Sequence, residues 1–244
     1  MDQEKFSAKK SAKRSSAKTS EGPKRSKPGA GLEKNKLKAG LYLVATPIGN
    51  LADLSLRGLE ILQNAEVIAC EDTRVTGKML SRHAIDTPMK AYHEHNAERA
   101  RPGLLRIIEA GGVVALVSDA GTPSISDPGY RLVNDCIDQG LEITAAPGAN
   151  AAITGLILSG LPTDRFLFAG FLPSKTSQRS KELAELAAVP ATLIFYESAK
   201  RLAAALTDMV AELGDRSAAV TRELTKLHEE IRRGTLSELA QHYQ

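Results

Sequence analysis

From residue 40 onward, short apolar runs rich in β-branched residues alternate with longer stretches of helical periodicity. This alternation is typical of α/β domains whose strands pair largely in parallel. The expected strands are Leu41–Ala45, Val67–Cys70, Val113–Val117, Glu142–Ala146, Phe166–Ala169, Thr192–Tyr196 and Ala218–Thr221. The expected helices cover residues 55–64, 74–83, 95–110, 129–139, 149–159, 177–188 and 198–213; Ser198 is expected to cap the last helix and Gly214 to end it.

Composition excludes several classes of protein. Apolar residues make up 42% of the 244 residues and charged residues 25%, which is ordinary for a globular chain and excludes a wholly disordered one. No apolar run reaches 18 residues and no secretory signal is present, so we expect a cytoplasmic protein without a membrane span. Two cysteines without a CxxC motif exclude a disulfide scaffold. The absence of Trp and an aromatic content of 4% leave little surface for stacking nucleobases.

Charge is distributed unevenly along the chain. Residues 1–38 hold 12 basic and 4 acidic side chains, a net charge of +8, whereas the remainder holds 20 and 25, a net charge of −5. A segment this rich in Lys, Ser, Gly and Pro cannot bury enough apolar surface to fold, so we predict a disordered basic tail. The tail could attach the chain to a polyanion such as RNA, or it could be a solubilising extension without a specific partner.

Ligands of parallel α/β sheets bind where strands end and loops converge. The turn at residues 46–50 contains Gly49 and follows the first strand, but it has neither the G-x-G-x-x-G pattern nor a P-loop, so taken alone it favours a plain turn over a ligand-binding loop. The twelve residues 118–129 are small and polar, with two Gly and two Pro, which is longer than a simple connection needs and indicates a ligand wall. Asp127-Pro128 is expected to start the next helix.

Charged side chains follow other strands. Glu71, Asp72 and Arg74 come directly after Val67–Cys70, where a carboxylate could act as a general base or could cap the next helix. Further polar loops cover residues 147–152, 170–175, 195–198 and 221–226. The His93-Glu94-His95 run lacks the spacing of a metal site and is interpreted as an exposed polar loop or an RNA-facing one.

An ordered set of motifs then resembles one family. TPIGNLADLS, CEDTRVTGKML, YHEHN, VSDAGTPSISDPGYRLV, PGANAAITGLILSGLPTDRF, GFLPSK, TLIFYES and TRELTKLHEE occur in this order over residues 40–244. The set closely resembles the ribosomal RNA small subunit methyltransferase I family, bacterial 16S rRNA ribose 2′-O-methyltransferases of the tetrapyrrole methylase superfamily. Any one of these motifs is modest, but their order is specific.

The resemblance implies a fold, a cofactor and partners. Two α/β domains of the tetrapyrrole methylase type, residues 40–155 and 156–244, are expected to hold S-adenosylmethionine in the cleft between them. The implied reaction methylates the ribose 2′-oxygen of a cytidine in the decoding centre of 16S rRNA in the small ribosomal subunit. Members of the family are dimers, so a homodimer is expected. The family pattern also continues with one more strand and a small helical region, so we expect the chain to be truncated at its C-terminus.

The resemblance also assigns cofactor contacts to positions in this sequence. These are Pro47, Ile48, Gly49, Asn50, Gly121, Thr122, Pro123, Ile125, Gly148, Ala149, Asn150, Ala151, Tyr196, Glu197, Arg222, Glu223, Gly234, Thr235 and Leu236. Thr235 and Glu238 are in addition spaced as the capping box of a final helix.

Methyl transfer to a ribose hydroxyl needs an acceptor for the hydroxyl proton. The candidates are Glu71, Asp72, Asp119 and Lys226. Basic side chains in or beside the loops could face RNA phosphates: Arg74, Lys78, Lys175, Arg179, Lys181, Lys200 and Arg201.

Two alternatives remain open. One is another methyltransferase of the same superfamily, acting on a tetrapyrrole or a modified elongation factor. The other is a non-catalytic RNA-binding or assembly protein.

Overall fold

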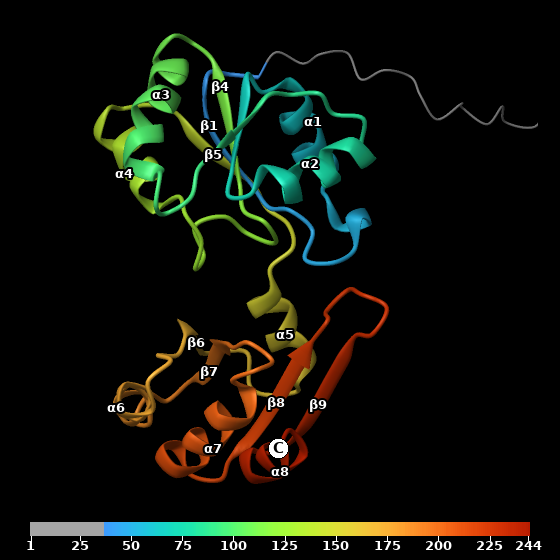
Figure 1. Cartoon of the computed structure of the whole chain (residues 1–244), viewed down its shortest axis with the longest axis vertical. Helices are drawn as coiled ribbons and strands as arrows, with labels where there is room; N and C mark the ends of the chain where they lie inside the picture. The colour runs from blue at the N-terminus through green and yellow to red at the C-terminus, as the bar shows by residue number, and fades with distance from the viewer. Residues whose placement is uncertain (1–36) are drawn as a thin grey trace, which may run out of the picture. The chain divides into compact units, whose positions relative to one another are not determined.

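A five-stranded sheet forms the first half of the computed structural model, which describes residues 37–244 (Figure 1). Its strands, in the spatial order β3-β2-β4-β1-β5, all pair in parallel. They are β1 (Gly40–Val44), β2 (Val67–Cys70), β3 (Met89–Ala91), β4 (Val113–Val117) and β5 (Ile143–Ala146). The predicted basic tail, residues 1–38, lies outside the described residues except for its last two positions.

Helices cover both faces of this sheet, because its central strands are apolar at every position. Along β4, Val114 and Leu116 belong to one core cluster, whereas Ala115 and Val117 belong to the other. The first cluster packs against α3 (Ala97–Glu109) and α4 (Tyr130–Asp138), and the second against α1 (Leu56–Asn64) and α2 (Thr73–Arg82). Successive side chains of a strand point to opposite faces, so a continuous apolar run is what a doubly covered sheet requires.

The second half of the chain contains two smaller sheets. Strands β6 (Phe166–Phe171) and β7 (Thr192–Tyr196) pair in parallel, and β8 (Ser217–Arg222) and β9 (Glu230–Thr235) form an antiparallel hairpin. Helices α6 (Thr176–Leu186), α7 (Leu202–Leu213) and α8 (Leu236–His242) supply a third core cluster beneath them. Helix α5 (Ala151–Ser159) follows β5 and packs against β7, β8 and β9 (Figure 1). The predicted α/β class is confirmed; the predicted domain boundary near residue 155 stays a prediction.

The structure confirms the caps that the sequence predicts at three helix ends. Asp72 caps α2 by accepting a hydrogen bond from the amide of Arg74. Gly214 ends α7 with a φ of +72°, a conformation that glycine adopts without strain. Thr235 and Glu238 form a reciprocal capping box at the start of α8.

Two predicted helix starts were wrong, and two strands were missed. Helix α7 begins at Leu202 rather than at Ser198, and α4 begins at Tyr130 after Gly129 rather than at Asp127-Pro128. Residues 124–129 belong instead to a strained loop that ends with a φ of +150° at Gly129. The missed strands β3 and β9 are an edge strand of three residues and a mostly polar hairpin strand, and neither shows an apolar run.

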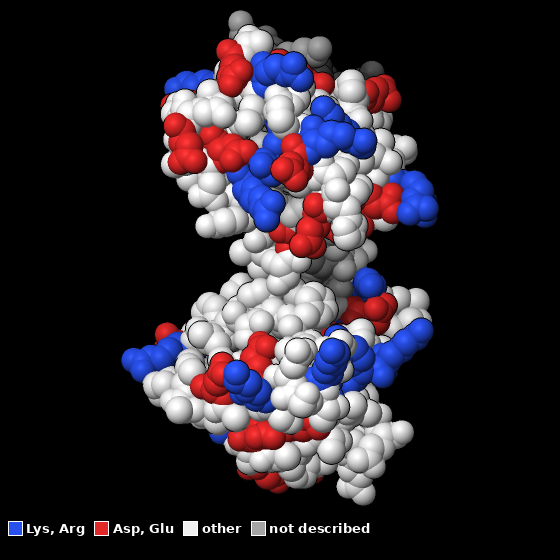
Figure 2. Space-filling model, turned by 60° about the vertical axis from the view of Figure 1, so that its left-hand side comes forward, with Lys and Arg blue, Asp and Glu red and all other residues white. Residues whose placement is uncertain are grey.

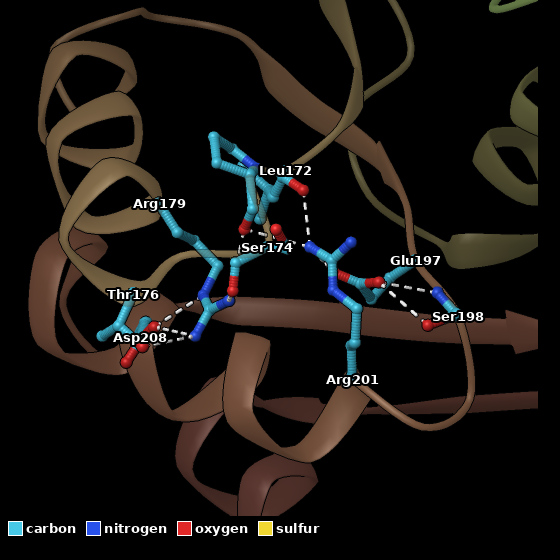
Figure 3. A network of polar contacts seen from close by, with 9 residues as sticks. Leu172, Ser174, Thr176, Arg179, Glu197, Ser198, Arg201 and Asp208 are labelled. Atoms are coloured by element: carbon cyan, nitrogen blue, oxygen red, sulfur yellow. Dashed lines mark hydrogen bonds and ion pairs between the residues drawn. The ribbon is translucent and has the colours of Figure 1, made fainter.

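A buried ion pair joins α6 to α7 (Figure 3). The guanidinium of Arg179 is only 4% exposed, and it lies 2.6 Å from the carboxylate of Asp208. Arg179 also donates to the carbonyls of Pro173 and Ser174, each at 3.3 Å. The prediction that Arg179 contacts RNA was therefore wrong, because its charge is buried and already paired inside the protein.

Replacing Arg179 should destabilise the fold, because it leaves the partly buried carboxylate of Asp208 and the carbonyls of Pro173 and Ser174 without their buried partner. We expect Arg179→Met to lower the free energy of unfolding by about 3–5 kcal/mol. The matched control is Lys181→Met on the same helix, where the side chain is exposed and the expected change is within about 0.5 kcal/mol. Urea unfolding followed by circular dichroism measures both; equal effects would contradict a structural role for the pair.

Candidate active site

Three loops meet above the carboxyl edge of the five-stranded sheet because β4, β1 and β5 are neighbours in it. The loops after β1 and β4 are joined by two backbone hydrogen bonds: the amide of Thr46 donates to the carbonyl of Gly121 at 2.8 Å, and the amide of Gly121 donates to the carbonyl of Thr46 at 3.0 Å. The side chain of Thr46 is buried, and its hydroxyl lies 3.2 Å from the carbonyl of Ser118. Gly121 has a φ of +85°, which explains a glycine at this position.

The loop after β5 is tied to the same assembly. The hydroxyl of Thr122 donates to the carbonyl of Ala149 at 3.1 Å and accepts from the side-chain amide of Asn150 at 3.3 Å. The side-chain oxygen of Asn150 caps α5 by accepting from the amide of Ile153. These contacts hold the three loops in fixed positions relative to one another.

A cavity of about 930 Å³ opens at these loops. Its volume is in the range of small-molecule and cofactor sites, roughly 300–1,000 Å³. Ten of the residues that the sequence assigned to a cofactor line it: Ile48, Gly121, Thr122, Ile125, Asn150, Ala151, Tyr196, Glu197, Arg222 and Leu236. Most of the loop side chains among them are short, which leaves room for a ligand close to the backbone.

Part of the cavity lies between strand edges rather than at the loops. Every residue of β7 and of β8 lines it, although these strands belong to separate two-stranded sheets. Successive side chains of a strand point to opposite faces of the sheet, so a cavity on one face would be lined by every second residue only. Consecutive residues line this cavity, which therefore runs along the edges of β7 and β8. The volume therefore combines an apolar region between β7 and β8 with a polar region at the loops, and the polar region is the candidate site.

Nine assigned cofactor positions do not line the cavity: Pro47, Gly49, Asn50, Pro123, Gly148, Ala149, Glu223, Gly234 and Thr235. Gly49 lies against the tip of the β8–β9 hairpin, where a Cβ would clash with the Cγ of Lys226. The amide of Asn50 donates to the hydroxyl of Thr225 in the same tip, at 3.1 Å. Thr235 caps α8, and Gly234 makes space for the Glu238 carboxylate of that cap.

The predicted catalytic carboxylates gather beside the cavity without lining it. The amide of Asp72 donates to the carboxylate of Asp119 at 3.0 Å, which joins the ends of β2 and β4. Hydrogen bonds from Arg74 lower the pKa of Asp72 to about 2. Burial raises the pKa of Glu71, and the nearby charges of Asp119 and Asp127 raise it further. The fourth candidate, Lys226, is 3.1 Å from the carboxylate of Glu223 at the hairpin tip.

Asp127 is a carboxylate in the cavity wall that the sequence analysis did not select. Partial burial raises its pKa, and the charge of Asp119 acts in the same direction. It follows Ser124 and Ser126, which have φ values of +68° and +60°. Strained non-glycine residues of this kind cluster at functional sites. The sequence signal that could have found it is the long polar loop itself, in which Asp127 before Pro128 is typical of a helix start.

The remaining cationic candidates differ in accessibility. Lys78, Lys175, Lys181 and Lys200 are exposed, and Arg74 is exposed but paired with Asp72. Arg201 is partly buried and contacts Glu197 at 3.1 Å. Figure 2 shows basic and acidic side chains interspersed over the face drawn. Any RNA contact on that face therefore depends on individual cations rather than on one broad positive surface.

Metal and membrane features are both absent from the part of the chain that the structure describes. Within residues 37–244, no group of three or more His, Cys, Asp or Glu side chains is placed to hold a metal ion. His93 and His95 stand edge to face, with ring centroids 6.1 Å apart. In the same range, no helix combines the length and apolarity needed to cross a bilayer.

Comparison with known proteins identifies the family. Residues 40–240 match the family Tetrapyrrole (Corrin/Porphyrin) Methylases. A protein of Mesorhizobium japonicum named ribosomal RNA small subunit methyltransferase I is 57% identical over 208 residues, which cover 85% of this chain and 71% of that protein. The chain belongs to the ribosomal RNA small subunit methyltransferase I family.

Solved structures share the fold at lower sequence identity. A cobalt precorrin-4 methyltransferase superposes with a TM-score of 0.64 at 18% identity, covering 88% of this chain and 92% of that one. Uroporphyrin-III C-methyl transferase from Thermus thermophilus, complexed with S-adenyl homocysteine, has a TM-score of 0.57 at 22% identity, covering 84% and 92%. The predicted tetrapyrrole methylase fold is therefore confirmed.

The paired hydrogen bonds of Thr46 and Gly121 can be tested with two glycine substitutions. Gly121 and Gly111 have φ values of +85° and +88°, but an added Cβ would lie 3.3 Å from Ile48 at Gly121 and would have no neighbour within 4 Å at Gly111. Both Gly121→Ala and Gly111→Ala should lower the free energy of unfolding by about 1–2 kcal/mol. Only Gly121→Ala should accelerate amide hydrogen exchange at Thr46 and residue 121. Equal exchange rates in the two variants would contradict the assigned role.

Proposed function

We propose that this chain transfers a methyl group from S-adenosylmethionine to the ribose 2′-oxygen of a cytidine in the decoding centre of 16S rRNA. The observation that carries the proposal is 57% identity over 208 residues with a protein named ribosomal RNA small subunit methyltransferase I. The choice of cytidine and of the 2′-oxygen rests on the resemblance of the ordered motifs. The fold neighbours at 18–22% identity support the fold alone.

The loop region of the cavity suits this cofactor. Gly121 and Ile48 form a surface of backbone and small apolar groups, which a flat ring can approach closely. Asn150, Glu197 and Arg222 add polar groups around the same space. We assign Ile48, Gly121, Thr122, Asn150 and Tyr196 to the cofactor side of the site.

The reaction needs alignment and a proton acceptor. S-adenosylmethionine, when bound, supplies an electrophilic methyl group on a positively charged sulfur. Asp127 accepts the proton that the ribose hydroxyl loses, because its carboxylate lines the cavity and its raised pKa makes it a stronger base than an ordinary aspartate. Asp72, with a pKa of about 2, is a weak base, and Lys226 is held by Glu223. Glu71 and Asp119 do not line the cavity and are assigned to orienting the loops.

The exposed lysines supply the RNA-facing charges. Lys175 and Lys200 follow β6 and β7, whose ends reach the cavity, and Lys226 is at the hairpin tip. Phosphate contacts of this kind give affinity that falls with salt. Two copies of the chain are expected to act as a dimer, on the strength of the resemblance.

Methyl transfer to purified small ribosomal subunits that lack the modification tests the proposal. We expect label from S-adenosylmethionine to appear in 16S rRNA, and mass spectrometry of the nucleosides to identify 2′-O-methylcytidine. Lys175→Glu and Lys226→Glu should reduce transfer. Arg106→Glu should not, because Arg106 is exposed at the end of α3 that leads into the start of β4, opposite the loops.

The same experiment separates the two alternatives. Methyl transfer to uroporphyrinogen, without transfer to rRNA, would indicate that the substrate is a tetrapyrrole and not RNA. Binding to rRNA without any binding of S-adenosylmethionine in calorimetry would indicate an RNA-binding protein without catalysis.

The proton acceptor can be tested separately through the dependence of rate on pH. A carboxyl group accepts a proton only when ionised, so the wild-type transfer rate should fall as the pH drops through the raised pKa of Asp127. Asp127→Asn should lose roughly 10²–10⁴-fold in rate while still binding S-adenosylmethionine in calorimetry. Asp119→Asn is the comparison, because Asp119 does not line the cavity. A larger loss in that variant would move the role to Asp119.

A further inference from the structure

Three aromatic rings gather where β6 and β7 end. The chain has five Phe, five Tyr and no Trp, and three of these ten rings, Phe168, Phe171 and Tyr196, lie side by side. The ring centroids of Phe168 and Tyr196 are 4.8 Å apart, and those of Phe171 and Tyr196 are 5.5 Å apart. Tyr196 and Phe171 line the cavity.

Phe171 is the exposed member of this cluster. Its side chain is 58% exposed although it sits in the cavity wall. Its neighbour Gly170 lies against the loop after β4, where a Cβ on Gly170 would be 3.3 Å from the hydroxyl of Ser126. Phe171 is therefore placed beside the loop that carries Asp127, with part of its ring surface open to solvent.

The backbone that follows Phe171 is held by two guanidinium groups, the buried one of Arg179 and the partly buried one of Arg201 (Figure 3). Arg201 donates to the carbonyls of Leu172 and Pro173 at 2.5 and 3.0 Å. Arg179 donates to the carbonyls of Pro173 and Ser174. Three successive carbonyls after Phe171 are thus held, so the ring is presented on a rigid segment rather than on a flexible loop.

Two exposed lysines lie on the segments that follow β6 and β7. Lys175 lies four residues after Phe171, and Lys200 adjoins Arg201, whose guanidinium contacts residues 172 and 173. Both lysine side chains are exposed. An exposed aromatic ring together with exposed cations on nearby segments is the combination that binds an unstacked nucleobase and its phosphates.

We propose that Phe171, supported by Tyr196, stacks a nucleobase of the RNA substrate that has been turned out of its helix. The inference rests on the proposed function and adds a substrate subsite to it. Sequence-specific recognition of RNA targets unstacked bases of single-stranded segments, and such a base stacks on an exposed aromatic side chain.

Adenine of the cofactor offers the same chemistry as an RNA base. Two observations favour the RNA. Four of the five residues assigned to the cofactor side lie on loops at the carboxyl edge of the five-stranded sheet, and Tyr196 alone is on β7, whereas Phe171 ends β6 and is 58% exposed. The neighbouring Lys175 and Lys200 suit phosphates, which the cofactor lacks.

A tryptophan at position 171 reports stacking directly, because the chain has no other. Phe171→Trp protein is titrated with single-stranded RNA, with the same RNA carrying abasic sites, and with S-adenosylmethionine. We expect quenching of tryptophan fluorescence by the intact RNA and much weaker quenching by the other two. Quenching by S-adenosylmethionine equal to that by RNA would assign the ring to the cofactor and overturn the proposal.

Affinities of alanine variants complete the test. Phe171→Ala should weaken RNA binding by about 5- to 100-fold with S-adenosylmethionine affinity unchanged, and Phe171→Trp should restore RNA binding. Phe166→Ala is the matched control, since Phe166 is on the same strand and 43% exposed but does not line the cavity.

The outcomes separate this subsite from the function on which it rests. Equal RNA binding by the Phe171→Ala and Phe166→Ala variants, with wild-type protein binding RNA normally, would overturn the subsite alone. Failure of the wild-type protein to bind RNA would overturn the proposed RNA substrate and the subsite with it.

Discussion

The paired backbone hydrogen bonds between Thr46 and Gly121 are the contact on which the candidate site depends. They close the loops after β1 and β4 onto each other, so that Thr122 and Asn150 can tie in the loop after β5. The pairing requires a left-handed backbone at position 121, which glycine supplies. Without it, the wall that carries Asp127 would have no fixed position relative to Ile48, and the cavity would lose its geometry.

Arginine and lysine side chains have different roles in the second half of the chain. Arg179 and Arg201 have planar guanidinium groups that contact several oxygens at once. Both donate to backbone carbonyls and form an ion pair with an acidic side chain of the same protein. The lysines nearby, Lys175 and Lys200, stay exposed. Arginine suits the internal role because its fork of donors satisfies several acceptors in one geometry. These contacts hold the backbone after Phe171 in place, so the exposed ring of Phe171 has a fixed position.

Much of the fold could be predicted because the relevant signals are local or periodic. The uninterrupted apolar runs of β2 and β4 indicate a sheet covered on both faces, and Gly214 and Thr235 mark helix ends through their own backbone chemistry. Strands β3 and β9 were missed because a short edge strand and a polar hairpin strand are stabilised by pairing with neighbours, not by their own pattern. Ser198 and Asp127 have the right residue types for helix starts, but the helices begin three or four residues later, at Leu202 and Tyr130.

The sequence by itself determined the α/β class, the loops that carry the site and the family, because apolar periodicity and ordered motifs survive without knowledge of the packing. Only the tertiary structure decided which side chains face the cavity. It removed Arg179 from the surface, set Asp72 against Arg74, brought Asp127 into the wall and left Phe171 exposed beside it. Burial and the distance between charges depend on segments far apart in the chain, so no local pattern could have assigned these roles.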